Sequence, residues 1–135
     1  MAIQLSTPVR NARLDAIETA IGPSPILRIR TGSVPANNAA ADSGTVLSTM
    51  TLPSDWMAAA ASGSKALLGT WQDSSADATG TAAHFRIYES TGTTCHMQGT
   101  VTASGGGGDM TITSTSITAG QLVSVLTFTL TDANA

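Results

Sequence analysis

The sequence is poor in charge, and this excludes several classes of function at the outset. Its 135 residues include only 6 Lys and Arg and 9 Asp and Glu, so 11% of the chain is charged, against about 25% in an average soluble domain. The formal net charge is −3, whereas proteins that bind nucleic acids use clustered Lys and Arg to neutralise phosphates. We therefore expect no nucleic-acid partner.

Reactive side chains are equally scarce. Cys95 is the only cysteine, so the chain can form no internal disulfide and no cysteine-rich zinc site. His84 and His96 are its only imidazoles, and on the hairpin predicted below they lie about 13 Å apart at roughly 3.3 Å per residue. That separation is too large for a shared zinc ion. We expect no catalytic residue, no metal and no cofactor.

Motifs that mark phosphate sites, nucleophiles or membrane segments are missing as well. Residues 104–108 are glycine-rich but lack the Lys-Ser/Thr that follows a phosphate-binding loop, and the chain has no Gly-x-Ser-x-Gly turn. It begins without a basic region and a long apolar run, and nowhere do about 18 apolar residues occur together. We expect a protein made in the cytoplasm, with no membrane partner.

Aromatic residues make up only 4% of the chain. Trp56, Trp71 and Tyr88 could stack on sugar rings, but each could equally fill the core, where such a side chain buries about 150–250 Å². We favour the core for both tryptophans and expect Tyr88 on the polar face of a strand, exposed to a partner. A carbohydrate-binding or host-adhesion module is an alternative that requires all three to be accessible.

Small residues are abundant instead: 15 Ser, 21 Thr, 21 Ala and 13 Gly occupy 70 of the 135 positions. Leu, Ile, Val and Phe together number 26, about 19% of the chain, close to the roughly 20% at which highly charged chains become disordered. With a low net charge the chain should fold, but around a lean core. Because ordering costs about 1.5 kcal/mol per residue, we expect it to bury further surface against partners.

The first segment carries the clearest helix signal. Thr7 is a potential N-cap, Pro8 suits the first helical position, and Gly22-Pro23 is a stop, which predicts a helix over residues 8–21. We interpret residues 1–24 as a helical arm whose apolar face docks on a partner. The candidate partner-binding residues are Leu5, Val9, Leu14, Ile17 and Ile21 on this arm, with Arg28, Arg30 and Tyr88 beyond it.

Beyond residue 24 the apolar period changes from about 3.6 to about 2. Strands at intervals of about 8–12 residues predict a mainly β fold, an antiparallel β-sandwich or jelly-roll-like barrel, as a single domain over residues 25–135 preceded by the N-terminal α-helix. Ser54 and the alanines after it predict a short additional helix. The predicted strands are 25–30, 46–52, 65–71, 81–88, 94–102, 109–112 and 122–130.

The turn Thr91-Gly92-Thr93 sets the register of one hairpin. Counting outward from it places apolar pairs on one face and polar pairs on the other, and a slip of one residue would mix the two faces. The predicted pairs are Phe85–Gly99, Arg86–Gln98, Ile87–Met97 and Tyr88–His96.

Several turn-and-strand motifs resemble one family. The segments DSSADATGTAAHFRIY (73–88), STGTT (90–94) and QGTV (98–101), with later ones at 109–110, 115–120 and 128–131, resemble small proteins encoded among the virion genes of tailed bacteriophages and prophages. The resemblance spans about residues 5–132. It implies a structural component of the virion, which would be assembled in the cytoplasm of the host bacterium.

Within that family we favour a noncatalytic head decoration or cement protein. Residues 1–30 would contact the major capsid protein or sibling subunits, while the sandwich projects outward in a symmetric homo-oligomer, for which a trimer is one option. A tail, collar or fibre-attachment protein is the alternative in the same class. The carbohydrate-binding module is the alternative from another class, and an enzyme ranks third.

Overall fold

The computed structural model describes residues 2–134, and it confirms a mainly β fold preceded by one N-terminal helix. The helix begins one residue before the predicted start and ends where predicted, at Gly22, whose amide donates to the carbonyl of Glu18. The elements are α1 (Thr7–Ile21), β1 (Ile26–Arg30), β2 (Val46–Thr51), β3 (Ser64–Ala66), β4 (Gln72–Asp73), β5 (Gly80–Thr81), β6 (His84–Tyr88), β7 (Cys95–Ala103), β8 (Met110–Ile112), β9 (Ser116–Ile117) and β10 (Val123–Thr131).

Most strands join one mixed sheet in the order β2-β1-β6-β7-β8-β10-β3, with β4 also paired to β10, while β5 and β9 form a separate pair. Every named strand pair is antiparallel except β7 with β8. The sheet curls, because its edge strand β2 comes back against β4. Asp73 joins them: its carboxylate accepts from the Ser48 hydroxyl at 2.8 Å and from the Thr49 amide at 3.3 Å.

The curled sheet surrounds a core in which four aromatic rings follow one another. Trp56 and Trp71 have ring centroids 5.9 Å apart, Trp71 and Phe128 5.4 Å, and Phe128 and Phe85 5.5 Å. All four side chains are buried, which confirms the core interpretation of both tryptophans. In a chain with so few large residues, these rings supply much of the apolar area removed from water.

The β6–β7 hairpin has the predicted register over most of its length. Phe85 pairs with Gly99, Arg86 with Gln98 and Ile87 with Met97. A Cβ on Gly99 would lie 2.8 Å from the Phe85 ring, so only glycine lets the ring lie across the strand. A bulge after Ile87 then pairs Tyr88 with Cys95 rather than with His96, which corrects the last predicted pair.

The glycine-rich segment 104–108 is a close-packed return between parallel strands. The Gly108 amide donates to the Thr102 hydroxyl at 3.0 Å, and Cβ atoms on Gly106 and Gly108 would come within 2.7 and 2.9 Å of Thr102. Asp109 then accepts from the Thr100 amide at 2.8 Å. The glycines therefore serve close approach, which lets so short a segment connect parallel strands.

Residues 54–61 do not form the predicted helix. The Ala61 and Ser64 backbones exchange two hydrogen bonds of 2.9 Å across a turn in which Ser62 and Gly63 have φ of 52° and 73°. Positive φ at both positions is typical of a type I′ hairpin turn. Pairing of this segment with β3 thus overrides the helix propensity of four alanines.

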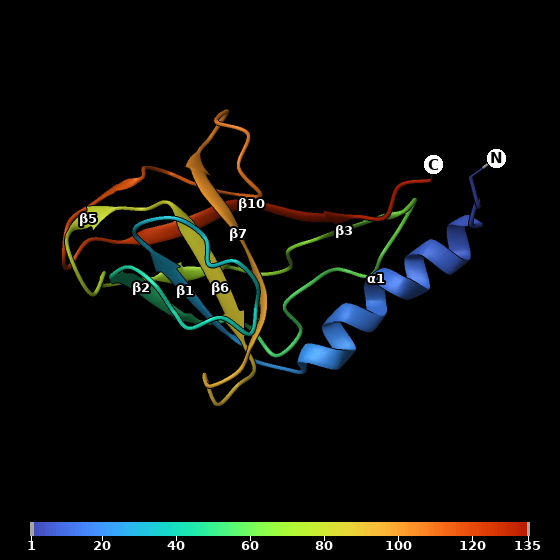
Figure 1. The fold of residues 1–135 in the computed structure, drawn as a ribbon, viewed down its shortest axis with the longest axis horizontal. Helices are drawn as coiled ribbons and strands as arrows, with labels where there is room; N and C mark the ends of the chain where they lie inside the picture. Colours follow the sequence, from blue (N-terminus) through green and yellow to red (C-terminus); the bar gives the residue numbers. More distant parts are fainter. Residues whose placement is uncertain (1, 135) are drawn as a thin grey trace.

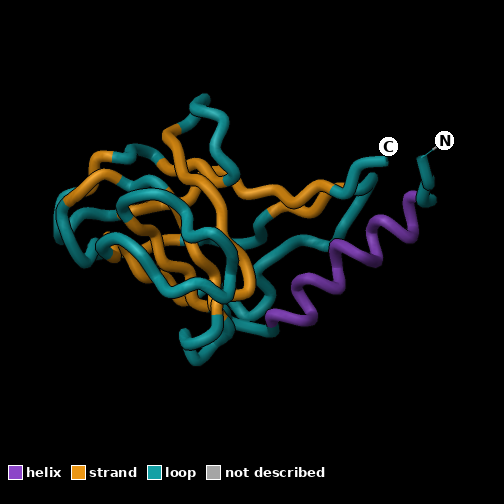
Figure 2. The backbone as a smooth tube through the Cα atoms, in the orientation of Figure 1, coloured by secondary structure: helices purple, strands orange, loops and turns teal. Residues whose placement is uncertain are grey.

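The molecule divides into a body and an arm (Figure 1). We define the body as β1, β2, β4–β9 and residues 123–128 with the core they enclose, and the arm as α1, residues 57–67 and residues 129–134. α1 packs against β3, and the described part of the chain begins and ends beside these two elements (Figures 1 and 2). The predicted arm, residues 1–24, is therefore one part of a unit built from three stretches of the chain.

Candidate functional site

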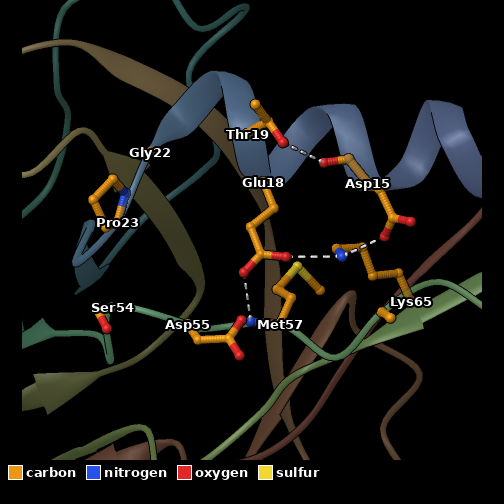
Figure 3. Close-up of a pocket in the computed structure, with 10 residues that line it drawn as sticks. Asp15, Glu18, Thr19, Gly22, Pro23, Ser54, Asp55, Met57 and Lys65 are labelled. Carbon is orange, nitrogen blue, oxygen red and sulfur yellow. Dashed lines mark hydrogen bonds and ion pairs between the residues drawn. The ribbon is translucent and has the colours of Figure 1, made fainter.

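One candidate site lies where α1 meets the arm hairpin, by which we mean residues 57–66 with their turn at Ser62 and Gly63 (Figure 3). Lys65 on β3 is 2% exposed, and its ammonium group has three acceptors: Asp15 Oδ1 at 2.7 Å, Glu18 Oε2 at 2.8 Å and the Ala58 carbonyl at 2.9 Å. An ammonium group has three donors. All three are therefore satisfied within the chain.

The same helix face covers the free edge of the hairpin. Glu18 accepts from the Met57 amide at 3.2 Å, Asp15 from the Ala60 amide at 2.9 Å, and Asn11 from the Gly63 amide at 2.9 Å. Spacings of four and three residues place these acceptors on one side of a helix. Side chains of α1 thus replace the neighbouring strand that an exposed edge would otherwise attract.

The electrostatics of this site favour its ionised form. Burial disfavours the Lys65 ammonium, but the hydrogen bonds that it donates to Asp15 and Glu18 outweigh this effect and raise the pKa of Lys65. The Lys65 hydrogen bond and the Ala60 amide lower the pKa of Asp15. A lysine held protonated has no lone pair for nucleophilic attack. The adjoining cavity of about 540 Å³, which Asp55 also lines, is bordered by an ion pair and not by an activated group.

A second candidate site lies under the strap, the long connection of residues 31–45 between β1 and β2 (Figure 2). Asp42 on the strap accepts from Arg86 at 2.5 Å, Tyr88 at 2.6 Å and Arg30 at 2.7 Å. Burial works against the charged carboxylate, yet the Tyr88 and Arg86 hydrogen bonds prevail and lower the pKa of Asp42.

Arg86 fixes the path of the strap. Its guanidinium also donates to the carbonyls of Asn38 at 2.8 Å, Ala40 at 3.1 Å and Asn37 at 3.3 Å. The side chain is 1% exposed, so leaving these donors without acceptors would be costly. Arg86 therefore holds the strap against the sheet through four oxygens and is not available to an external anion.

His84, which pairs with Arg30 across β1 and β6, is a further buried polar group of this site. It is fully buried, and its Nδ1 lies 2.8 Å from the Gly32 carbonyl, while Nε2 has no hydrogen-bond partner among residues 2–134. Burial lowers the pKa of His84, so the imidazole is neutral. His96 lies on the exposed side of β7, and within the described chain no three His, Cys, Asp or Glu are placed to hold a metal ion.

The structure buries four of the eight candidate partner-binding residues within the chain. Leu14, Ile21, Arg30 and Tyr88 are buried within the chain, at 3%, 8%, 6% and 2% exposed. The two aliphatic residues face the rest of the arm and the core, and the other two are held by Asp42. They are therefore not a free contact surface.

The remaining four retain some exposure. Val9 is 45% exposed, and Leu5, Ile17 and Arg28 are half-buried. The Arg28 guanidinium lies 4.6 Å from the centre of the Tyr88 ring and so covers it. With both tryptophans and Tyr88 buried, the sugar-stacking alternative loses the three aromatics on which it depended.

Sequence reasoning missed Lys65 and Asp42 as the centres of the two clusters. Lys65 is the only lysine, and Asp15 and Glu18 share one face of the predicted helix, which was a usable signal. For Asp42 the signal was weaker. Arg28, Arg30 and Arg86 fall on neighbouring strands with few carboxylates nearby in sequence, and arginines on a sheet face need an acceptor.

Comparisons with protein-family models, with curated proteins and with solved structures found no match. Among residues 2–134, no helix is both long and apolar enough to span a membrane. The fold and the two clusters define a class only: a mainly β protein whose buried charges are paired internally.

Proposed function

We propose that this chain is a noncatalytic structural protein of a tailed-bacteriophage or prophage virion, and more narrowly a head decoration or cement protein. It would bind the major capsid protein and sibling subunits as part of a homo-oligomer. The motifs at 73–88, 90–94 and 98–101 support the virion assignment by resemblance. We base the narrower proposal of a head decoration protein on the exposed outer face of α1 in the arm.

The observation that carries the proposal is the difference between the two faces of α1. The inner face is tied to the hairpin by Asn11, Asp15 and Glu18. The outer face carries Val9, Ala12, Ala16 and Ala20, all of which are exposed. A face of small side chains lets a partner approach the helix backbone closely, and its neutrality avoids repulsion between many packed copies.

The internal use of charge supports a noncatalytic role. The chain itself satisfies all three donors of the Lys65 ammonium, and the Arg86 guanidinium binds four oxygens of the strap. The raised pKa of Lys65 and the lowered pKa of Asp42 both favour the charged forms. Catalysis requires groups that change protonation or attack a substrate. A protein built this way acts through contact area.

Particle occupancy tests the proposal. Ala16→Glu places a charge on the outer face of α1 without touching a buried contact. Leu122→Glu is the matched control, at a position outside the arm that directly precedes β10 and is 55% exposed. We expect Ala16→Glu to lower the number of copies per purified particle at least tenfold, with Leu122→Glu near wild type, as quantified by mass spectrometry. Equal occupancy of the two variants would contradict the proposal.

Imaging separates the head from the tail. A decoration protein should appear by electron cryomicroscopy over the whole shell, in a copy number comparable with that of the major capsid protein. Density confined to the tail, collar or fibre base would overturn the head placement and favour the tail-associated alternative. Absence from purified particles would overturn both.

A further inference from the structure

We propose that α1 is exchanged between copies: in the assembled state, the hairpin of one subunit is covered by α1 of a second copy, reciprocally. The surface is the side of residues 57–66 and Asp132 that α1 occupies, and the partner that fits it is an identical helix. This inference does not depend on the protein belonging to a virion, and it goes beyond a contact made by the outer face.

The docking of α1 is governed by complementary charge. Towards the hairpin the helix presents Asp15 and Glu18, which meet Lys65 at 2.7 and 2.8 Å. Towards the end of β10 it presents Arg10, which donates to the Asp132 carbonyl at 2.9 Å, and Arg13, which lies 3.2 Å from the Asp132 carboxylate. Opposite charges on opposite sides of one helix fix its orientation.

Nothing in these contacts requires helix and hairpin to come from the same molecule. A second copy carries the same acidic and basic pattern, so its α1 would make the same ion pairs and the same amide contacts. Two copies that exchange helices therefore keep every inner-face contact and lose none.

The connection between α1 and β1 favours the exchange. Only Gly22, Pro23, Ser24 and Pro25 separate the helix from the strand, and Ser24 has φ of 50°. That value is unfavourable for a side chain other than glycine, and a residue before proline prefers an extended conformation. An extended hinge, as in an exchanged dimer, relieves Ser24, and short strained hinges promote domain swapping.

The position of α1 makes the exchange geometrically simple. The helix lies along the arm and outside the body, and a single chain segment joins it to the sheet (Figure 1). Of its apolar side chains only Leu14 and Ile21 are buried. Ile21 is the one helix residue buried in the core cluster, and Trp56 Nε1 donates to the Gly22 carbonyl at 3.1 Å. Because both contacts lie at the hinge end of α1, the rest of the helix can move to a second copy while the four rings stay packed on one another.

Two charge-reversed chains test the exchange. In Lys65→Glu the hairpin repels its own α1, and in the double variant Asp15→Lys with Glu18→Lys the helix repels its own hairpin. When the two are mixed, only exchange restores an ion pair at both helix–hairpin contacts, one as in the wild type and one with reversed signs. The reversed contact still lacks the hydrogen bonds from the Met57 and Ala60 amides, because an ammonium group cannot accept them. We expect each variant alone to be a monomer of lowered Tm, and the mixture to show doubled mass by light scattering with Tm raised towards that of the wild type.

Ser24→Gly tests the hinge with all charges intact. Because glycine tolerates φ of 50°, the closed monomer gains stability, and we expect the dimer fraction of the wild-type chain to fall at least fivefold in a dilution series. Pro35→Ala, at a proline outside the hinge, is the control that should leave the fraction unchanged.

Two results would overturn the exchange: a mixture that keeps the mass and Tm of the separate variants, or a wild-type chain that stays monomeric at every concentration while Ser24→Gly changes nothing. Should a charge variant fail to fold by circular dichroism, the wild-type and Ser24→Gly measurement decides alone. All of these experiments use purified protein, so their outcome is independent of particle occupancy.

Discussion

The body and the arm of this protein are stabilised in different ways. The body encloses four aromatic rings whose neighbouring centroids lie 5.4–5.9 Å apart. The arm contains no aromatic residue and is held by Lys65, by Asp132 and by side chains of α1 that accept from backbone amides. The chain has concentrated its aromatic residues in the body, whereas the arm combines these polar contacts with the packing of Ile21 and Met57 against the core.

This difference predicts unequal stability. Apolar burial contributes about 25 cal/mol for each Å² removed from water, whereas ion pairs at partly exposed positions contribute about 0–1 kcal/mol. The arm should therefore open at a lower free energy than the body, and it is the region that carries both proposed interactions. A helix that is exchanged between copies, or that docks on a partner, belongs to a region that opens at a low free energy.

The largest effect is expected in the body, from Trp71→Ala. Removing a ring in contact with both Trp56 and Phe128 leaves a cavity, and we expect the free energy of unfolding to fall by about 3–5 kcal/mol, measured by chemical denaturation. Leu122→Ala, at an exposed position, should change it by no more than about 0.5 kcal/mol. A similar loss for both variants would remove the distinction between core and surface.

A smaller effect is expected from Arg86→Met, which releases the strap. In this variant Asp42 keeps two of its three hydrogen-bond donors, and the strap carbonyls lose the guanidinium that donates to them. The Asp42 side chain is 37% exposed, so water can replace the missing donor. We expect a loss of about 2 kcal/mol. Arg13→Met, whose side chain is 61% exposed, is the matched control. Unchanged stability in Arg86→Met would show that the strap needs no anchor.

Lys65→Met should affect the arm alone. Methionine fills the same space, and the carboxylates it leaves behind lie close to water, so we expect about 1 kcal/mol less stability. Cleavage by a nonspecific protease should increase within residues 57–63, while the body remains resistant. Asp55→Asn, an exposed charge beside the same cavity, serves as control. Loss of the whole structure in Lys65→Met would contradict the separation of arm and body.

The smallest effect is a pH dependence that originates in the body. Because burial lowers the pKa of His84 below its ordinary value of 6.5, the unfolded chain binds a proton that the folded chain does not. Stability should therefore fall as pH drops below about 6.5. His84→Gln should flatten this slope between pH 6.5 and 5, whereas His96→Gln should retain it.

At lower pH the protonation of carboxylates determines how stability changes with pH. The folded-state pKa of Asp42 is lowered, so its contribution is present above the unfolded value of about 3.9 and is lost as pH falls through the folded value. Denaturation curves of Asp42→Asn should lose this acid-dependent part. A wild-type chain with stability constant from pH 7 to pH 3 would contradict both assignments.

Local sequence rules predicted the elements that depend on neighbours in the chain. The period of apolar residues and the stop at Gly22-Pro23 located α1, and Thr91-Gly92-Thr93 set the β6–β7 register as far as Ile87. They failed where distant segments decide. The alanines at 58–61 pair with β3 in spite of their helix propensity, and the parallel β7–β8 pair depends on a loop packed against Thr102.

The candidate site was predicted less completely than the fold, for a related reason. Alternation along β6 correctly separated Phe85 and Ile87 from Arg86 and Tyr88, but it could not show that a strap covers the polar face. Tyr88 is buried under the strap, where its hydroxyl donates a hydrogen bond to Asp42, a residue 46 positions earlier. Which loop covers a strand depends on tertiary contacts that periodicity does not contain.

Native-state hydrogen exchange, measured by mass spectrometry over increasing denaturant, tests the difference between arm and body most directly. We expect amides of α1 and of residues 57–66 to exchange through a partial opening, at a lower free energy than amides of β1, β6 and residues 123–128. Lys65→Met should lower the opening free energy of α1 and residues 57–66 only. Exchange of both regions at one common free energy would contradict the separate stabilisation of arm and body.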